Sequence, residues 1–206
     1  MDIRKFFKVE TVNPKGTFIK PKVDTIKPKV DIENGYETDV KPSTIRVYTD
    51  GSAINNGKKN CYGGIGIFFG DNDPRNVGDK LSTDKISNNV AELIACQRAI
   101  EILINDDKVN NKIIICTDSE YMINCITVWV YSWEKNNWQR NVKGKNKPIK
   151  NLDIIKKIKS YVDKYNIIFK HIKSHKTSPS NKNSLEYFDW YGNDMADKLA
   201  KKGAEK

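Results

Sequence analysis

Two short apolar segments that each run into an aspartate restrict the fold of this chain more than any other feature. The acid is Asp50 in YTDGS and Asp118 in ICTDSEY, and small or polar residues follow both. The run 112–117 has the length and apolar character of a parallel strand covered on both faces. Ligands gather at the carboxyl ends of such strands. We therefore predict an α/β fold in which two acids meet at neighbouring strands.

The segments around the first acid have the pattern of β-hairpins. IRVYTDGSA (45–53) alternates and is rich in β-branched residues, and CYGGIGIFFG (61–70) and RNVGDKLS (75–82) follow after Gly, Asn and Asp residues that favour turns. Three antiparallel strands are predicted here.

The next segment, NNVAELIACQRAIEILI (88–104), predicts a helix. Its apolar residues fall on a broad helical stripe, and its leading Asn pair can cap the free backbone N–H groups of the first turn. The remaining elements are predicted, in chain order, as a strand at 112–117, a helix at 119–134, a basic loop at 135–150, a helix from Asn151 to about 164, a strand at 166–172 and a closing helix near 193–203. The predicted order is βββαβαβα.

Four acidic residues occupy positions from which the backbone could bring them together: Asp50, Glu92, Asp118 and Asp197. Any one of them alone would be read as a surface carboxylate. As a cluster they would repel one another and their pKa values would rise, so a bound divalent cation is the economical explanation. Oxygen ligands favour Mg²⁺ or Mn²⁺.

Several motifs resemble, in order and spacing, those of type 1 ribonuclease H: YTDGSAINNG, NVGDKLSTDKISNNVAELIACQRAIEIL, TDSEYMINCITVWVYSWEKNNW and GNDMADKLAKKGA. The resemblance covers residues 44–206. It implies a ribonuclease H-like α/β fold with a five-stranded mixed sheet flanked by helices, in which strands 1–3 are antiparallel and strands 4 and 5 run parallel to strand 1. It also implies an endonuclease that cuts the RNA strand of RNA–DNA hybrids and leaves 5′-phosphates.

The resemblance assigns the family's metal ligands to Asp50, Glu92, Asp118 and Asp197. Asp194 lies one helical turn before Asp197 and is the nearest competitor, so a place for it beside the site stays open. The family's chemistry implies two Mg²⁺ ions about 3.5–4 Å apart, which activate the attacking water and stabilise the leaving 3′-oxygen. Mn²⁺ is expected to substitute.

His175, in HIKSHK, matches the family's loop histidine that assists proton transfer or product departure, whereas His171 does not match. Its place between the last strand and the Asp197 helix favours this role over that of a surface residue. The following segment, 176–191, is longer than the family's short loop, so the position of His175 is left to the structure. Four aromatic residues in that segment could cover the sheet edge or touch substrate: Tyr187, Phe188, Trp190 and Tyr191.

Tryptophans recur through VWVYSWEKNNWQRNVKGKNK, interleaved with Lys and Arg. This segment resembles the family's basic protrusion, in which aromatic faces pack on deoxyribose and cations neutralise phosphates. Packing in a helix core is the alternative, and it is expected for at least one of Trp129, Trp133 and Trp138.

The resemblance also implies which side chains hold the hybrid. Tyr121 and Trp129 would line the DNA-strand channel, with Trp133 beside them, and Asn151 would bind a DNA phosphate. RNA 2′-hydroxyls or bases in the minor groove would be read by three asparagines, Asn56, Asn88 and Asn89. The latter two have the competing role of helix caps.

The first residues, MDIRKFF, place Ile3, Phe6 and Phe7 at the spacing of a sliding-clamp-binding peptide, which docks as a short helical turn. A terminus with chance aromatics is the alternative. Residues 1–8 are therefore expected to bind a PCNA-type clamp and to recruit the protein to DNA replication. Residues 9–43, with the near-repeat KPKVDTI and KPKVDI, predict an extended, flexible linker, because proline disfavours helix and the lysines repel one another.

Charge and cysteine usage restrict the setting. The formal net charge of +10 suits a polyanionic partner such as nucleic acid. The four cysteines lack the CxxC spacing of a zinc or redox site, and no run approaches the length of a membrane span. We expect a soluble, intracellular monomer that acts in the nucleus or at a cytoplasmic replication site.

The sequence is also compatible with two other functions. One is a hybrid-binding or clamp-associated module that kept the fold and lost the chemistry, against which the four intact acids argue. The other is a different nuclease or an integrase of the same fold, which would lack the tryptophan-rich protrusion and the NNVAEL helix start.

Overall fold

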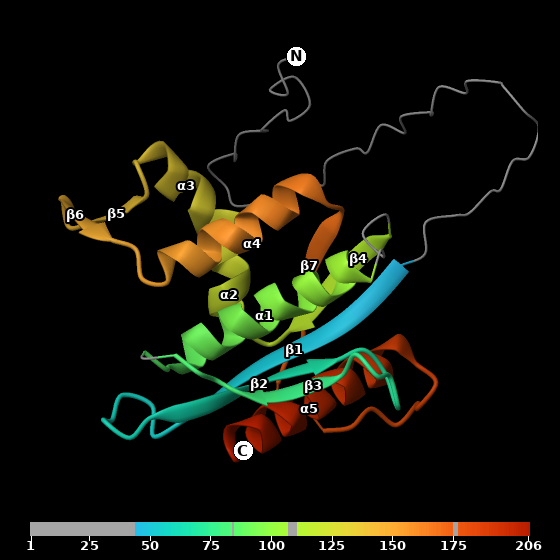
Figure 1. The fold of residues 1–206 in the computed structure, drawn as a ribbon. Helices are drawn as coiled ribbons and strands as arrows, with labels where there is room; N and C mark the ends of the chain where they lie inside the picture. The colour runs from blue at the N-terminus through green and yellow to red at the C-terminus, as the bar shows by residue number, and fades with distance from the viewer. Residues whose placement is uncertain (1–43, 84, 107–110, 175–176) are drawn as a thin grey trace, which may run out of the picture. The chain divides into compact units, whose positions relative to one another are not determined.

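The computed structural model describes residues 44–83, 85–106, 111–174 and 177–206 (Figure 1). The expected clamp-binding peptide and linker, and the loop residue His175, lie outside the described residues.

A five-stranded mixed sheet with the order β3-β2-β1-β4-β7 forms the centre of the described fold. Its strands are β1 (Thr44–Ile54), β2 (Tyr62–Phe68), β3 (Val77–Lys80), β4 (Lys112–Thr117) and β7 (Ile167–His171). The first three strands pair antiparallel, while β4 pairs parallel with β1 and β7 pairs parallel with β4. The predicted fold class is therefore confirmed, including the direction of each of these five strands.

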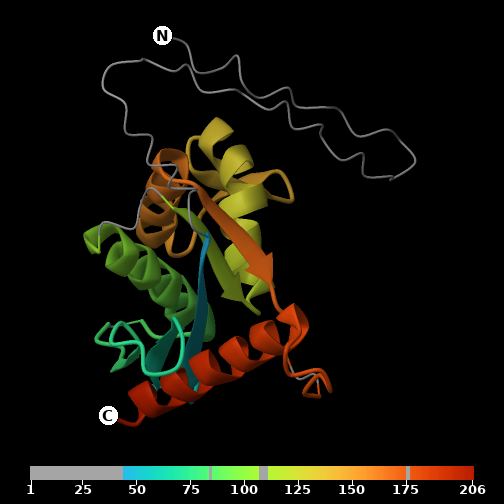
Figure 2. The ribbon, with the colours of Figure 1, turned by 90° about the vertical axis from the view of Figure 1, so that its right-hand side faces the viewer.

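Helices cover both faces of this sheet. α1 (Asn88–Asn105) and α4 (Leu152–Lys164) lie on one side and α5 (Leu185–Ala204) on the other (Figures 1 and 2). Glycines permit the close approach: a Cβ on Gly51 would lie 2.2 Å from a backbone nitrogen of α1, and one on Gly66 would lie 1.9 Å from a backbone oxygen of α5. Two buried apolar clusters result, one on each face.

The N-terminus of α1 differs from the prediction in its cap. Ser87, and not the Asn pair, precedes the helix, and its side chain accepts a hydrogen bond from the Val90 N–H at 3.3 Å. The Asn88 side chain instead accepts a 2.9 Å hydrogen bond from the backbone N–H of Ala53. Ser and Asn are comparable caps, so the local sequence does not decide between them.

The segment predicted as a helix at 119–134 is helical from Glu120 onward but not uniform. It consists of α2 (Glu120–Asn124), the π-helical turn η2 (Cys125–Trp129) and α3 (Val130–Lys135). A π turn widens the helix locally and changes which residues share a face, and such turns are frequent at functional sites. Residue types alone do not reveal it.

The prediction of a loop at 135–150 was wrong. β5 (Gln139–Val142) and β6 (Lys145–Pro148) form a two-stranded hairpin there, and both turn residues, Lys143 and Gly144, have positive φ angles of 52° and 75°. Two-residue hairpin turns favour such angles. Both strands consist mainly of exposed polar residues, so they lack the alternating pattern by which a strand is recognised.

The closing helix begins eight residues earlier than predicted. α5 starts at Leu185, where the Ser184 side chain caps it by accepting a hydrogen bond from the Tyr187 N–H at 3.1 Å. Gly192 lies inside this helix although glycine disfavours helix interiors. The structure gives the reason for this glycine: a Cβ there would lie 2.4 Å from the ring of Tyr48.

Most of the cysteines occupy buried packing positions. Cys96, Cys116 and Cys125 are buried and Cys61 is partly exposed, and all four are free thiols. Among the described residues, every helix is too short or too polar to cross a lipid bilayer.

Candidate active site

Three carboxylates converge at the edge between β1 and β4. Asp50 lies in β1, Glu92 in the second turn of α1, and Asp118 follows the last residue of β4. One oxygen from each lies within 4.8 Å of the other two. The parallel pairing of β1 and β4 brings the two aspartates together, and the close contact of α1 with Gly51 brings Glu92 to them.

Burial and mutual repulsion make this group electrostatically unfavourable. The pKa of Asp50 is raised to about 7, first by burial and then by the charges of Asp118 and Asp197. Burial likewise raises the pKa of Glu92 well above its ordinary value, with Asp50 and Asp118 adding to the effect. A group of acids held in this state favours the binding of positive charge.

The donor set fits a hard divalent cation. Every candidate ligand is a carboxylate oxygen, which is the donor that Mg²⁺ and Mn²⁺ prefer. Glu92 Oε2 is buried and has no hydrogen-bond partner in the described part of the chain. A buried carboxylate oxygen left in this way is costly, and a cation would satisfy it.

Asp197 approaches the group from α5. It lines a cavity of about 310 Å³ together with Asp118 and Asp194. Its charge contributes to the raised pKa of Asp50, which places it near the three clustered carboxylates although it is not one of them. Its competitor Asp194 faces the same cavity and pairs with Lys198 at 2.7 Å.

Two other residues of this cavity, Lys201 and Asn193, were not predicted from the sequence. Lys201 Nζ lies 2.6 Å from Asp197 Oδ2, and the i, i+4 spacing of the pair on a helix was a signal that could have identified it. Asn193 Oδ1 is buried and has no hydrogen-bond partner among the described residues. Only the fold shows that this oxygen is buried at the cavity.

The candidate hybrid-binding aromatic residues lie together on α2, η2 and α3. The ring centroids of Tyr121 and Trp129 are 6.0 Å apart, and those of Trp129 and Trp133 are 5.9 Å apart. Trp129 is 37% exposed, which leaves a face for a partner. The Tyr121 hydroxyl contacts the side chain of Asn151, so these four candidates form one surface.

Some of the tryptophans pack against the apolar core, as expected. Trp133 and Trp138 pack against the main apolar cluster, and Lys156 Nζ lies 4.6 Å from the ring centroid of Trp138. Of the three tryptophans, Trp129 is the one that counts among the exposed large apolar residues.

The three candidate RNA-reading asparagines are all exposed. Asn56 lies in the turn after β1, and Asn88 and Asn89 form the first residues of α1. The hydrogen bond between Asn88 and Ala53 joins α1 to β1 and fixes the orientation of that side chain.

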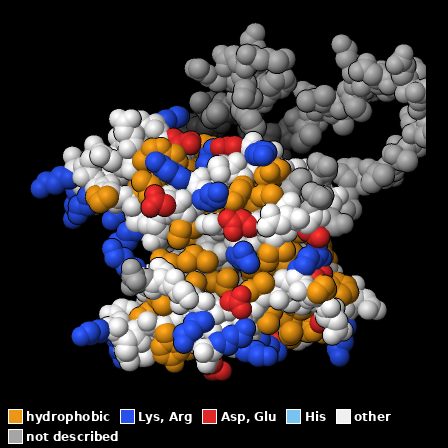
Figure 3. Space-filling view, viewed as in Figure 1, with side chains coloured by type: hydrophobic (Ala, Val, Ile, Leu, Met, Phe, Trp, Pro, Cys, Tyr) orange, Lys and Arg blue, Asp and Glu red, His pale blue; other side chains and the backbone are white. Residues whose placement is uncertain are grey.

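Positive charge gathers on the β5–β6 hairpin, where Lys and Arg side chains project from one end of the molecule (Figure 3). Its exposed cations are Arg140, Lys143, Lys145 and Lys147. The hairpin follows α3 directly and therefore extends the aromatic surface of Tyr121 and Trp129 with a cationic one.

Of the two histidines, His171 lies within the described residues and His175 does not. His171, which the resemblance excluded, ends β7, and its Nε2 lies 3.3 Å from the backbone oxygen of Asp118. His175 lies outside the described residues, so its assigned role stays a prediction.

Comparison with known proteins agrees with this arrangement. The sequence model of the RNase H family matches residues 42–205. Ribonuclease H of Schizosaccharomyces pombe is 36% identical over 158 residues, which are 77% of this chain and 52% of that protein, so the chain spans about half of that relative. Ribonuclease HI of Rickettsia prowazekii is 34% identical over 163 residues, which are 79% of this chain and 92% of that protein.

A solved structure shows the same fold. The RNase H domain of prototype foamy virus has a TM-score of 0.57 and 27% identity, with 78% of this chain and 94% of that domain covered. Sequence motifs, sheet topology and converging acids thus agree with the family model. This chain belongs to the RNase H family of enzymes.

Proposed function

We propose that the protein is an endonuclease that hydrolyses the RNA strand of RNA–DNA hybrids. The observation that carries this proposal is the convergence of Asp50, Glu92 and Asp118 within 4.8 Å, in a chain of the RNase H family. Two of these acids have raised pKa values, as expected for a site built to receive positive charge.

Asp50, Glu92, Asp118 and Asp197 would hold two Mg²⁺ ions, with Mn²⁺ as a substitute. Bound there, the cations would polarise the scissile phosphate, activate water and neutralise the charge that develops on the leaving 3′-oxygen, giving 5′-phosphate products. The chain's own part is to fix the ligands on β1, α1, β4 and α5, whose packing sets their positions. His175 would accept or deliver a proton near the leaving group.

The substrate would be held on the side of α1, η2 and the hairpin. Tyr121, Trp129 and Trp133 would pack on deoxyribose of the DNA strand, and Asn151 would bind a DNA phosphate. Asn56, Asn88 and Asn89 would read the RNA strand, whose 2′-hydroxyl distinguishes it from DNA. The exposed cations of the hairpin would add affinity that falls with salt.

The test is cleavage of a labelled strand in three duplexes: the RNA strand of an RNA–DNA hybrid, one strand of duplex RNA and one strand of duplex DNA, each with Mg²⁺, Mn²⁺ or EDTA. Wild-type protein should cut the hybrid alone and only with a cation. Asp118→Asn should keep the fold and hybrid affinity but lose cleavage by about a hundredfold or more, because it removes a ligand and not a packing residue. Glu205→Gln, an exposed acid at the end of α5, is the control.

The same assay separates the alternatives. Tight hybrid binding without cleavage by wild-type protein would identify a non-catalytic hybrid-binding module. Cleavage of duplex DNA would identify a different nuclease. Near-normal turnover by Asp118→Asn would defeat the assignment of the acids.

Recruitment by a PCNA-type sliding clamp is a separate proposal. It rests on Ile3, Phe6 and Phe7 in MDIRKFF, followed by the Lys- and Pro-rich residues 9–43 as a tether to the catalytic domain at 44–206. Calorimetry with a PCNA-type clamp should detect binding by the full chain and its loss in Phe6→Ala/Phe7→Ala. Phe18→Ala, within the tether, should bind normally. Equal affinity of all three proteins would remove clamp binding from the function.

A further inference from the structure

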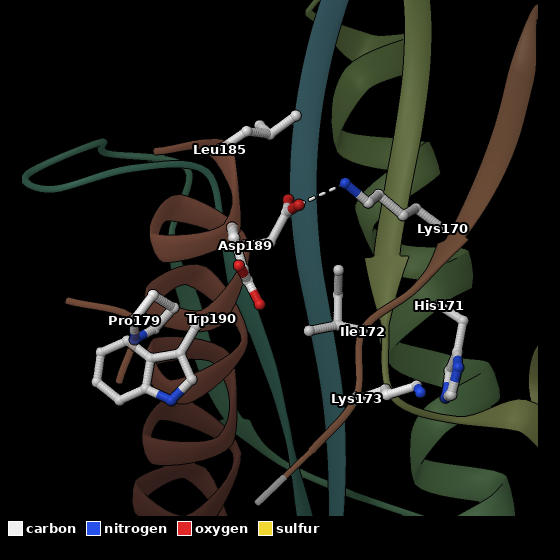
Figure 4. A pocket seen from close by; sticks show the side chains of 9 residues that line it. Lys170, His171, Ile172, Lys173, Pro179, Leu185, Asp189 and Trp190 are labelled. Carbon is white, nitrogen blue, oxygen red and sulfur yellow. Dashed lines mark hydrogen bonds and ion pairs between the residues drawn. The ribbon is translucent and has the colours of Figure 1, made fainter. Parts of the chain in front are cut away.

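A second cavity, of about 420 Å³, lies where β7 ends and α5 begins (Figure 4). Its walls come from the end of β7 and the residues after it, from the loop before α5, and from the first two turns of α5. The residues that matter here are Lys170, His171, Ile172, Lys173, Pro179 and Trp190. The α5 wall belongs to the segment 176–191, which exceeds the family's short loop.

This cavity adjoins the one that contains the candidate catalytic acids. Ile172, Lys173 and Trp190 line both, while Asp118 and Asp197 line only the catalytic one. A nucleic-acid strand with a phosphate at the acids would therefore have its next nucleotide at these three shared residues.

The lining has the chemistry that binds an unpaired nucleotide. Trp190 offers a partly exposed aromatic face, and Figure 4 shows Pro179 and Trp190 on one side of the cavity and His171 and Lys173 on the other. Aromatic rings stack on bases, and exposed ammonium groups such as Lys173 neutralise phosphates. A paired base is already stacked in its duplex, so this lining favours a single strand.

The α5 wall is held firmly in place. Buried Asp189 accepts a 3.2 Å hydrogen bond from the Tyr48 hydroxyl and forms ion pairs with Arg46, at 3.5 Å, and with Lys170. These contacts fix the first turns of α5 to β1 and β7. The two acids of the lining, Glu186 and Asp189, are matched in number by Lys170 and Lys173, and Asp189 also pairs with Arg46. A preorganised wall loses little entropy on binding.

The cavity lies on the opposite side of the acids from the proposed duplex-binding residues. Those residues come from α1, η2 and the hairpin, whereas the cavity is built by β7 and α5, and α1 and α5 cover opposite faces of the sheet (Figure 2). A strand that crosses the acids from the duplex side would continue toward Trp190.

We propose that this cavity binds an unpaired nucleotide of the RNA strand adjacent to the scissile phosphate, with its base on Trp190 and its phosphate at Lys173. The inference rests on the proposed function and deepens it: the protein would prefer hybrids whose RNA strand continues beyond the duplex as a single strand.

The test compares fluorescent hybrids that are blunt or carry a short single-stranded RNA extension at the 5′ or the 3′ end. Binding is measured by anisotropy with the full-length Asp118→Asn protein, so that the RNA stays intact. One extension should tighten binding about fivefold or more, the effect of one stacked base. Trp190→Leu should abolish this gain in affinity, and so should Lys173→Gln. The Lys173 side chain is exposed, so its substitution should leave the fold intact, and a lost gain would not be due to misfolding.

Phe188→Leu is the matched control. Phe188 lies on the same first turns of α5 as Trp190, is 52% exposed and is not part of the cavity lining. The variant should therefore keep the gain in affinity that the extension gives. Equal affinity for blunt and extended hybrids, or a gain that survives in Trp190→Leu, overturns the inference. Wild-type cleavage of the blunt hybrid with Mg²⁺ is scored separately: its absence counts against the proposed function, and its presence without an extension effect counts against this inference alone.

Discussion

The Tyr48 hydroxyl on β1 donates a 3.2 Å hydrogen bond to Asp189 on α5, across 141 residues of sequence. Both residues are buried, at 6% exposure each. Burial, with the charges of Cys116 and Asp189 adding to it, raises the pKa of Tyr48, so the hydroxyl stays protonated and available as a donor. This contact holds the first turns of α5 against the sheet. Trp190, which lies on these turns, lines both cavities, so the contact helps to fix their shape.

Tyr48→Phe should therefore lower the free energy of unfolding by about 2 kcal/mol, because a buried carboxylate loses a charge-assisted hydrogen bond while the ring volume is kept. Urea denaturation measures the difference. Tyr62→Phe, at a residue that is 37% exposed, serves as the control and should change stability little. Equal effects of the two substitutions would show that the Asp189 contact contributes nothing specific.

Stability without divalent cations should fall as the pH rises from about 4 to about 7. The pKa of Asp50 is raised from its ordinary 3.8 to about 7, so the folded state binds this proton more tightly than the unfolded state. Where the folded state holds more protons, stability decreases with pH, and the loss is complete above the folded pKa. Urea midpoints in EDTA across this range test the sign.

Asp50→Asn is the comparison for that profile, because it removes the titrating group. The difference between wild type and variant should narrow toward low pH and favour the variant near neutrality. Added Mn²⁺ should restore wild-type stability there and not that of the variant. A wild-type profile that rises relative to Asp50→Asn over the same range would contradict the prediction.

Lys201 should act as an internal counterion of the acids. Its Nζ lies 2.6 Å from Asp197 Oδ2, and this hydrogen bond raises the pKa of Lys201, with the charges of Asp197, Asp50 and Asp194 adding to the effect. Removing this charge should let divalent cations bind about two- to tenfold more tightly, since Asp197 is released and a repelling charge is lost. Calorimetry with Mn²⁺ on Lys201→Gln measures this without any substrate.

Lys198→Gln provides a matched comparison for that experiment. It also breaks an i, i+4 ion pair on α5, between Lys198 and Asp194 at 2.7 Å. Asp194 lies one helical turn before Asp197, so this substitution leaves Asp197 paired with Lys201. Its cation affinity should change less than that of Lys201→Gln. Identical changes would mean that net charge alone, and not the position of Lys201, sets the affinity.

The cap of α1 can be tested by substitution. Ser87→Ala should lower stability by about 1 kcal/mol, because the Val90 N–H loses its acceptor. Ser82→Ala, at an exposed position before the helix, should have almost no effect. Thermal unfolding compares the two, and a larger loss in Ser82→Ala would place the start of the helix elsewhere.

The amino-acid sequence by itself determined the sheet and the three clustered acids. β1 and β4 carry strong local patterns, which predicted that Asp50 and Asp118 meet at neighbouring strands, whereas the resemblance to ribonuclease H assigned Glu92 to the same group. The burial of Asp50 and Glu92 is a consequence of the same packing.

Tertiary structure alone decided the features that depend on contacts between distant residues. The β5–β6 hairpin is polar and exposed and so lacks a periodic pattern, and the start of α5 was hidden because Gly192 makes room for Tyr48, 144 positions earlier in the chain. The partners of Asp189 and the second cavity likewise arise where β1, β7 and α5 pack together. Local sequence encodes the tendency of a segment to form a helix or a strand, whereas close contacts depend on which surfaces the complete fold brings together.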